Sequence, residues 1–158
     1  MIWNKIGLLL GIFLFTGGTI HAQAILESFT LKDQHDIPQK IQFPSSKSLI
    51  FIVGDRDTSA QTKSWQPELS KSIGKKADYI IIAALGSVPE FLRGVTKSSI
   101  HSERSVLLDW DNAISRKLGY LPKKCSVVGV NSHGVILAHE NTYFSPEKMK
   151  RLCDALGI

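Results

Sequence analysis

The chain has 158 residues, 43% of them hydrophobic, with 19 Lys and Arg against 14 Asp and Glu. Its length allows one ordinary globular domain, and its average composition excludes a disordered, collagen-like or low-complexity protein. A formal net charge of +5 without a basic cluster argues against nucleic acid as a partner. The two cysteines, Cys125 and Cys153, are too few for a disulfide scaffold and lack the spacing of zinc ligands.

The first 24 residues have the three parts of a secretory signal peptide. They contain no Asp or Glu, Lys5 gives a positive start, and an apolar run follows over residues 6–15. This run has ten residues, whereas a helix that spans a membrane needs about 20. Residues 22–24, Ala-Gln-Ala, form the small-x-small pattern that a signal peptidase reads.

Cleavage is therefore expected after Ala24, with Ala22 as the competing site. The sequence predicts a signal peptide over 1–24 and a mature domain over 25–158 that has no membrane span. We expect the mature domain to be periplasmic or secreted, in an oxidising compartment.

Predicted strands and helices alternate along the mature part. Strands are predicted over Phe29–Leu31, Lys40–Phe43, Ser48–Val53, Tyr79–Ala84, Val106–Leu108, Cys125–Val130 and Val135–His139. Helices are predicted from Ser59 or Gln61 to Ile73, briefly over Pro89–Leu92, over Asn112–Leu118, and from Ser145-Pro146-Glu147 onward, with a polar loop over Lys97–Arg104. Alternation followed by a terminal hairpin and helix predicts an α/β fold with a mixed sheet and helices on both faces.

Several stretches carry a more specific pattern. Residues 106–113 form a strand that ends in Asp and leads into a helix, 118–120 is the exit of that helix, and 127–136 is an apolar hairpin. Together with 49–69, which ends in Pro-Glu-Leu, they resemble the redoxin branch of the thioredoxin-like superfamily. The resemblance implies a thioredoxin-like three-layer sandwich, with a mixed central sheet of about five strands and helices on both faces.

The resemblance also implies where a reactive dithiol would lie. Redoxins place a thiolate at the N-terminus of the helix after the first central strand, where N–H groups and the helix dipole lower the thiol pKa. Aligning residues 67–69 with the redoxin tripeptide puts Ser59 and Thr62 at the two cysteine positions, and no cysteine occurs over 25–124. Hydroxyls cannot cycle between dithiol and disulfide. Cys125 stands where the fold usually has a cis-proline.

The chain is thus most similar to small periplasmic redoxin-fold proteins of Gram-negative bacteria that lack the dithiol. This similarity implies a binding or accessory role in the cell envelope, with a protein or small molecule as partner. Neither a cofactor nor a metal is expected. The candidate binding residues lie around the former active-site pocket: Asp55, Arg56, Asp57, Ser59, Thr62 and, in the Lys123–Cys125 segment, Lys124.

An alternative is thiol oxidoreductase or peroxidase-like chemistry with Cys125 as the single catalytic residue. Lys123 and Lys124 would favour its thiolate if the side chain faced the pocket. The competing interpretation is a buried strand cysteine that packs as a small apolar side chain. A disulfide with Cys153 is disfavoured, since that residue lies two turns into the last helix and the bond needs Cα atoms within about 7 Å.

A second alternative is a magnesium-dependent phosphatase of the haloacid-dehalogenase type. Residues 55–58, Asp-Arg-Asp-Thr after an apolar strand, resemble its acidic start motif, with Asp55 as nucleophile and Mg²⁺ on the phosphate. Asp109 and Asp111 could supply the later acidic motif. The motif is a weak signal, and a polar turn that caps the next helix is the simpler interpretation.

Four further side chains are candidates for packing or binding. Trp65 is predicted to pack on the sheet, and Trp110 to be partly exposed, either packed or part of a binding surface. His139 and His133 flank the hairpin strand, and surface histidines are favoured over a metal site.

Overall fold

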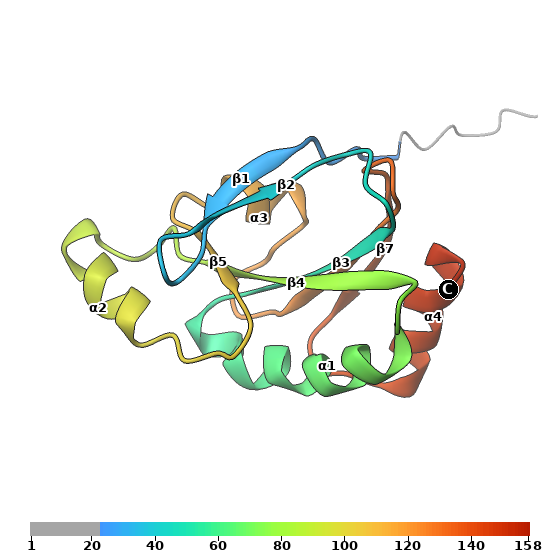
Figure 1. Cartoon of the computed structure of the whole chain (residues 1–158). Coiled ribbons are helices and arrows are strands. Elements are labelled where there is room, and N and C mark those ends of the chain that lie inside the picture. The colour runs from blue at the N-terminus through green and yellow to red at the C-terminus, as the bar shows by residue number, and fades with distance from the viewer. Residues whose placement is uncertain (1–22) are drawn as a thin grey trace, which may run out of the picture.

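The computed structural model describes residues 23–158, which build a layered α/β domain (Figure 1). The strands of its central sheet are β3 (Ser48–Gly54), β4 (Ala77–Ala84), β5 (Val106–Asp109), β6 (Ser126–Val130) and β7 (Ile136–Asn141). They lie in the order β5-β4-β3-β6-β7. β3, β4 and β5 are parallel to one another, whereas β6 pairs antiparallel with both β3 and β7.

The connections explain this mixed topology. Crossovers that contain helices join β3 to β4 and β4 to β5, as parallel neighbours require. A tight turn joins β6 to β7, with the amide of Gly134 donating to the carbonyl of Asn131. The apolar run over 50–53 is fully buried, which confirms that β3 lies at the centre of the sheet.

One face of the sheet is covered by α1 (Ser59–Ser72) and α4 (Pro146–Leu156), which Figure 1 shows below the strands. Trp65 and Leu69 of α1 and Met149 and Leu152 of α4 are buried there against the sheet. The predicted start of α4 is confirmed, because the hydroxyl of Ser145 accepts a hydrogen bond from the amide of Lys148 at 3.3 Å.

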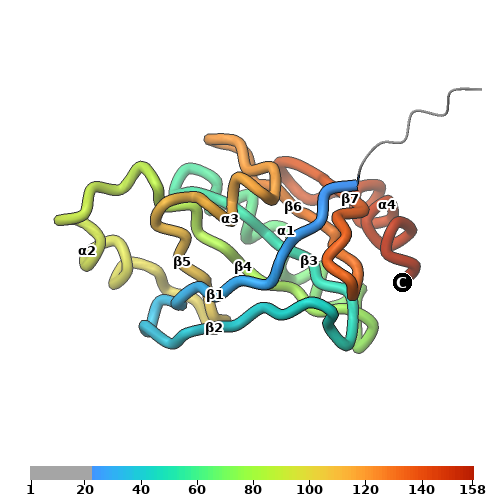
Figure 2. Tube along the Cα trace, turned by 90° about the horizontal axis from the view of Figure 1, so that it is seen from above, coloured from blue at the N-terminus to red at the C-terminus, as the bar shows by residue number. Residues whose placement is uncertain are grey.

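The other face is covered by the hairpin of β1 (Phe29–Lys32) and β2 (Pro38–Ile41) and by the short helix α3 (Ala113–Lys117) (Figure 2). Their apolar side chains pack on the sheet residues that point to this face. Phe51 and Leu118 are buried in the second core that results. The predicted sandwich is therefore confirmed: three layers, a mixed sheet of five strands and helices on both faces.

The turn between β1 and β2 is fastened to the sheet edge by two buried polar side chains. The carboxylate of Asp33 accepts hydrogen bonds from the amides of His35 and Ile37, and from the side chains of Gln39 and Ser105. Gln34 accepts a hydrogen bond from the amide of Val106 and donates one to the carbonyl of Arg104. These contacts hold the turn against the start of β5.

The loop predicted over Lys97–Arg104 starts before the helix has ended, since its first two residues are helical. A 3₁₀ turn, η2 (Glu90–Leu92), continues into a helix, α2 (Arg93–Ser98). No residue of η2 or α2 is buried, so the segment lacks the apolar periodicity that indicates a helix in a sequence.

The predicted signal peptide, 1–24, lies outside the described residues apart from its last two. Ala24 accepts a hydrogen bond from the amide of Ile136, and the amide of Leu26 donates to the carbonyl of Gly134. Residues 24–26 are thereby attached to the β6–β7 hairpin. Over residues 23–158, none of the helices has the length and apolar character needed to cross a membrane.

Candidate functional site

The carboxyl end of β3 leads directly into a cap built around Asp55. One carboxylate oxygen of Asp55 accepts a hydrogen bond from the amide of Thr58 at 3.1 Å, and the Thr58 hydroxyl accepts one from the Asp55 amide at 2.8 Å. This reciprocal pair forms a capping box for the 3₁₀ turn η1 (Arg56–Thr58) that precedes α1. The predicted capping role of Asp55 is confirmed.

The second carboxylate oxygen of Asp55 reaches the segment before β6. It accepts hydrogen bonds from the Tyr120 hydroxyl at 2.7 Å and from the Lys123 amide at 2.9 Å. Burial alone would raise the pKa of Asp55, but these bonds and that from Thr58 hold the pKa below its usual value. Asp55 is therefore an ionised structural link whose oxygens already have partners.

Beside this cap, Gln61 and Thr62 of α1 contact Cys125, at a site where the resemblance to redoxins predicts a thiol in place of Thr62 and a cis-proline in place of Cys125. The Thr62 hydroxyl donates to the Cys125 sulfur at 3.6 Å, and the Gln61 side-chain oxygen accepts from the Cys125 amide at 2.9 Å. We call Gln61, Thr62 and Cys125 the thiol-position cluster. Gly54 lets the helix start approach β3 this closely, because a Cβ there would lie 2.7 Å from the Thr62 hydroxyl.

The surroundings of Cys125 disfavour its thiolate. The side chain is 0% exposed, and burial, together with the Asp55 carboxylate, raises the thiol pKa to about 11 against the smaller opposing effects of Thr62 and Lys148. Lys123 and Lys124 are both exposed, so the expected support of a thiolate by these lysines is absent from this geometry. Cys125 and Cys153 are both free thiols, which agrees with the expectation that they do not form a disulfide.

Alkylation of Cys125 in the native chain is expected to be slow. With a pKa of about 11, only about one thiol in ten thousand is ionised at pH 7. Iodoacetamide at pH 7, followed by mass spectrometry, should modify Cys125 at least about a hundredfold more slowly than in the urea-unfolded chain. The half-buried Cys153 provides an internal reference. Equal rates in the native and unfolded chains would contradict the buried geometry.

The other predicted binding residues lie at the surface around this site. Arg56, Asp57, Ser59 and Lys124 are exposed, and their side chains form no hydrogen bond or salt bridge with other described residues. The structure thus brings Asp55, Thr62 and Cys125 together. The four exposed side chains, Arg56, Asp57, Ser59 and Lys124, form a polar rim around them. Neither Gln61 nor Tyr120 was recognised from the sequence as part of the site.

The acidic residues do not converge as a phosphatase would require. Asp109, at the end of β5, is buried, and one of its oxygens accepts hydrogen bonds from the Ser115 amide and hydroxyl, both at 2.7 Å. Strand β4 separates it from Asp55 in the sheet. Within residues 23–158, no three His, Cys, Asp or Glu side chains are grouped so as to hold a metal ion.

No protein-family model matches the sequence, and no curated protein matches it. Solved structures do match. The exposed lipoprotein thioredoxin Etrx1 of Streptococcus pneumoniae aligns with a TM-score of 0.64 and 12% identity, over 80% of this chain and 98% of that one. The peroxidoxin BcpB of Mycobacterium tuberculosis aligns with a TM-score of 0.61 and 14% identity, over 86% and 96%.

A thiol:disulfide interchange protein of the thioredoxin family from Chlorobium tepidum aligns with a TM-score of 0.56 and 14% identity, over 85% of this chain and 96% of that one. The chain therefore has the thioredoxin fold and resembles redoxin-type proteins, as its sequence suggested. Identities of 12–14% support the fold and not an activity.

Proposed function

We propose that residues 25–158 form an exported thioredoxin-fold protein of the cell envelope that binds a partner and does not perform dithiol chemistry. The binding surface would be the rim of Arg56, Asp57, Ser59 and Lys124 around the thiol-position cluster. One observation carries this proposal: a threonine hydroxyl, and not a second thiol, faces Cys125 at the start of α1.

The site does not meet either requirement of dithiol exchange. Disulfide exchange needs an accessible thiolate and a second thiol to resolve the mixed disulfide. Thr62 offers no sulfur, and Cys125 is buried with a raised pKa. The Asp55 cap, by contrast, fixes the backbone of the turn and of the segment before β6, from which the exposed rim side chains project.

Single-thiol chemistry at Cys125 is the weaker proposal. A peroxidase-like cysteine needs a lowered pKa, which helix N-termini or nearby cations supply. The cation that acts on the thiol, Lys148, donates hydrogen bonds to the carbonyls of Asn141 and Tyr143 and to the Thr142 hydroxyl. Burial outweighs its effect on the thiol pKa.

The phosphatase proposal is weaker still, because its nucleophile is already committed. Asp55 accepts three hydrogen bonds within the fold, and these occupy both of its oxygens. The thioredoxin fold also differs from the architecture that the start motif implies.

Export is supported by the leader-like sequence over 1–24 and by a neighbour in structure that is itself an exposed lipoprotein. Expression of the full chain in a Gram-negative host, with intact mass measurement of the periplasmic fraction, tests it. A chain that begins at Ile25 is expected, and one that begins at Gln23 would also support export, through the competing site.

A matched control is Leu9→Arg, which places a charge in the apolar run and should retain the uncleaved chain inside the cell. An uncleaved, unmodified chain confined to the cytoplasm would contradict export. The same result for the unchanged and the Leu9→Arg chains would show that residues 1–24 direct nothing.

A further inference from the structure

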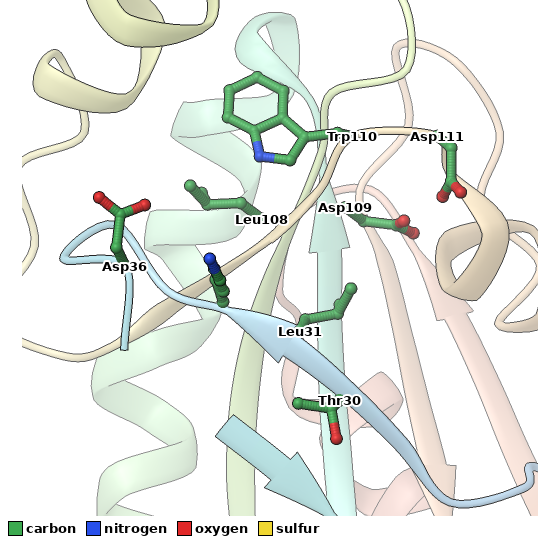
Figure 3. Close-up of a pocket in the computed structure, with 8 residues that line it drawn as sticks. Thr30, Leu31, Asp36, Leu108, Asp109, Trp110 and Asp111 are labelled. Carbon is green, nitrogen blue, oxygen red and sulfur yellow. The ribbon is translucent and has the colours of Figure 1, made fainter. Parts of the chain in front are cut away.

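A second candidate site lies at the same end of the sheet as Asp55, beside the edge strand β5, which β4 separates from β3. Two adjoining hollows, of about 270 and about 200 Å³, share Asp36 and Trp110. Figure 3 shows the residues that line the first of them. We call them together the Trp110 pocket. Its lining comes from β1 and the β1–β2 turn, from the end of β5 and from α2. Ligands of open α/β sheets bind outside the carboxyl ends of the strands, and Trp110 follows β5 at that edge.

The walls of the Trp110 pocket are held in place independently of any ligand. The β1–β2 turn is fastened to the start of β5 by the buried Asp33 and Gln34. At the tip of the turn, Asp36 forms an ion pair with Lys97 of α2. This pair ties the turn to α2 across the pocket, so the hollows are preformed, as small-molecule sites usually are.

Two positive side chains in the lining lack a carboxylate partner. The Arg93 guanidinium lies over the Trp110 ring, 5.2 Å from the ring centroid, and its Nε is enclosed without a hydrogen-bond acceptor. Lys32 also lines the pocket, and among residues 23–158 neither it nor Arg93 takes part in a salt bridge. An enclosed guanidinium N–H without an acceptor is an unmet requirement that an anionic ligand would satisfy.

The acidic lining does not supply this acceptor. Asp36 is paired with Lys97. Asp109 accepts from Ser115 through one oxygen, while its other oxygen is buried without a donor and forms no bond with Arg93. Figure 3 shows the carboxyl groups of Asp109 and Asp111 pointing away from the indole ring. The apolar part of the first hollow is thus Leu31, Leu108 and the indole of Trp110, with Lys32 beside it, and Arg93 lines the adjoining hollow.

We propose that the Trp110 pocket binds a small organic carboxylate with a flat apolar part, such as an aromatic carboxylate. Its carboxylate would meet Arg93 and Lys32, and its flat part would lie beside Trp110, Leu31 and Leu108. A planar guanidinium matches a carboxylate in two hydrogen bonds, and the indole offers a flat apolar surface. A hollow of about 270 Å³ is just below the usual minimum of about 300 Å³ for ligand pockets, which indicates a small ligand.

This pocket is separate from the rim around Asp55, since β4 lies between β3 and β5. The proposal therefore does not depend on the absence of dithiol chemistry or on export. A protein that fails either of those tests could still bind a carboxylate here, and the converse also holds.

Nuclear magnetic resonance of the full chain tests the proposal with benzoate as the probe. The indole N–H resonance of Trp110 is the reporter, and that of the buried Trp65, which donates to the Thr142 carbonyl, is the reference. Benzoate is expected to shift the Trp110 resonance with a millimolar dissociation constant and to leave Trp65 unchanged. Benzamide, which keeps the ring, and acetate, which keeps the charge, should each bind at least about tenfold more weakly.

Arg93→Gln should weaken benzoate binding at least about tenfold, because the charged hydrogen bond is lost. Arg93 lies on a helix without buried residues, so the variant is expected to fold, and an unchanged Trp65 resonance checks this. Lys75→Gln removes an equal charge from an exposed position and should leave binding unchanged. Equal binding of benzamide, an unaffected Arg93→Gln variant, or shifts confined to the thiol-position cluster would overturn the proposal.

Discussion

Replacing Trp65 by Ala is expected to lower the free energy of unfolding by about 3–5 kcal/mol. Among residues 23–158 the indole is the largest fully buried side chain, and it packs between α1 and the sheet, with the Phe144 ring edge-on and the ring centroids 5.5 Å apart. Its Nε1 also donates to the Thr142 carbonyl at 2.8 Å, which joins α1 to the loop before α4. The variant loses the apolar contacts and this hydrogen bond, and it leaves a cavity. Urea unfolding followed by circular dichroism measures the loss.

Trp65→Phe is the matched control for the packing contribution. It keeps an aromatic ring but leaves the Thr142 carbonyl without its donor, so a smaller loss of about 1–3 kcal/mol is expected. Lys63→Ala, on the exposed side of the same helix, should change the free energy by no more than about 0.5 kcal/mol. A Trp65→Ala variant as stable as Lys63→Ala would contradict the packing described for α1.

Asp33→Ala is expected to lower the free energy of unfolding by about 2–4 kcal/mol. The buried carboxylate accepts four hydrogen bonds, and its removal leaves the amides of His35 and Ile37 without acceptors. The β1–β2 turn would then lose its attachment to β5. Because this turn also forms one wall of the Trp110 pocket, benzoate binding should weaken in the same variant.

The contribution of Asp33 should depend on pH in a defined direction. Burial raises the pKa of Asp33, but the hydrogen bonds from Ile37, His35 and the two side chains outweigh burial and lower it. A lowered folded-state pKa means that the stabilisation is fully present above the ordinary pKa of an aspartate and is lost as the pH falls below that value and through the lowered pKa. The stability difference between the unchanged chain and Asp33→Asn should therefore shrink from about pH 6 to about pH 3. A difference that grows towards low pH would contradict this assignment.

The layers of the fold could be predicted because their signals are local. The apolar run over 50–53, the hairpin turn before Gly134 and the Ser145 cap each specify one element within a few adjacent residues. Helix α2 could not be predicted in full, because it buries no residue and so leaves no apolar period. Its position matters, since it contributes Arg93 to the Trp110 pocket.

The site could be predicted only in part, for a related reason. The resemblance placed Thr62 near Cys125, and the structure brings these two side chains into contact. Gln61 pairs with a backbone amide 64 positions away, and the Tyr120 hydroxyl pairs with Asp55, 65 positions away. Such long-range pairs leave no pattern within either segment. Trp110 was recognised as a packed or binding residue, but the cations around it come from two segments distant in the sequence, β1 and α2.

The most direct test of the central claim is insulin reduction by the full chain in the presence of dithiothreitol, with a thioredoxin run in parallel to validate the assay. A protein whose thiol-position cluster pairs Thr62 with a buried Cys125 cannot pass electrons through a dithiol. We predict a rate equal to that of dithiothreitol alone, both for the unchanged chain and for Cys125→Ser. A rate well above that background, abolished in Cys125→Ser, would contradict the account.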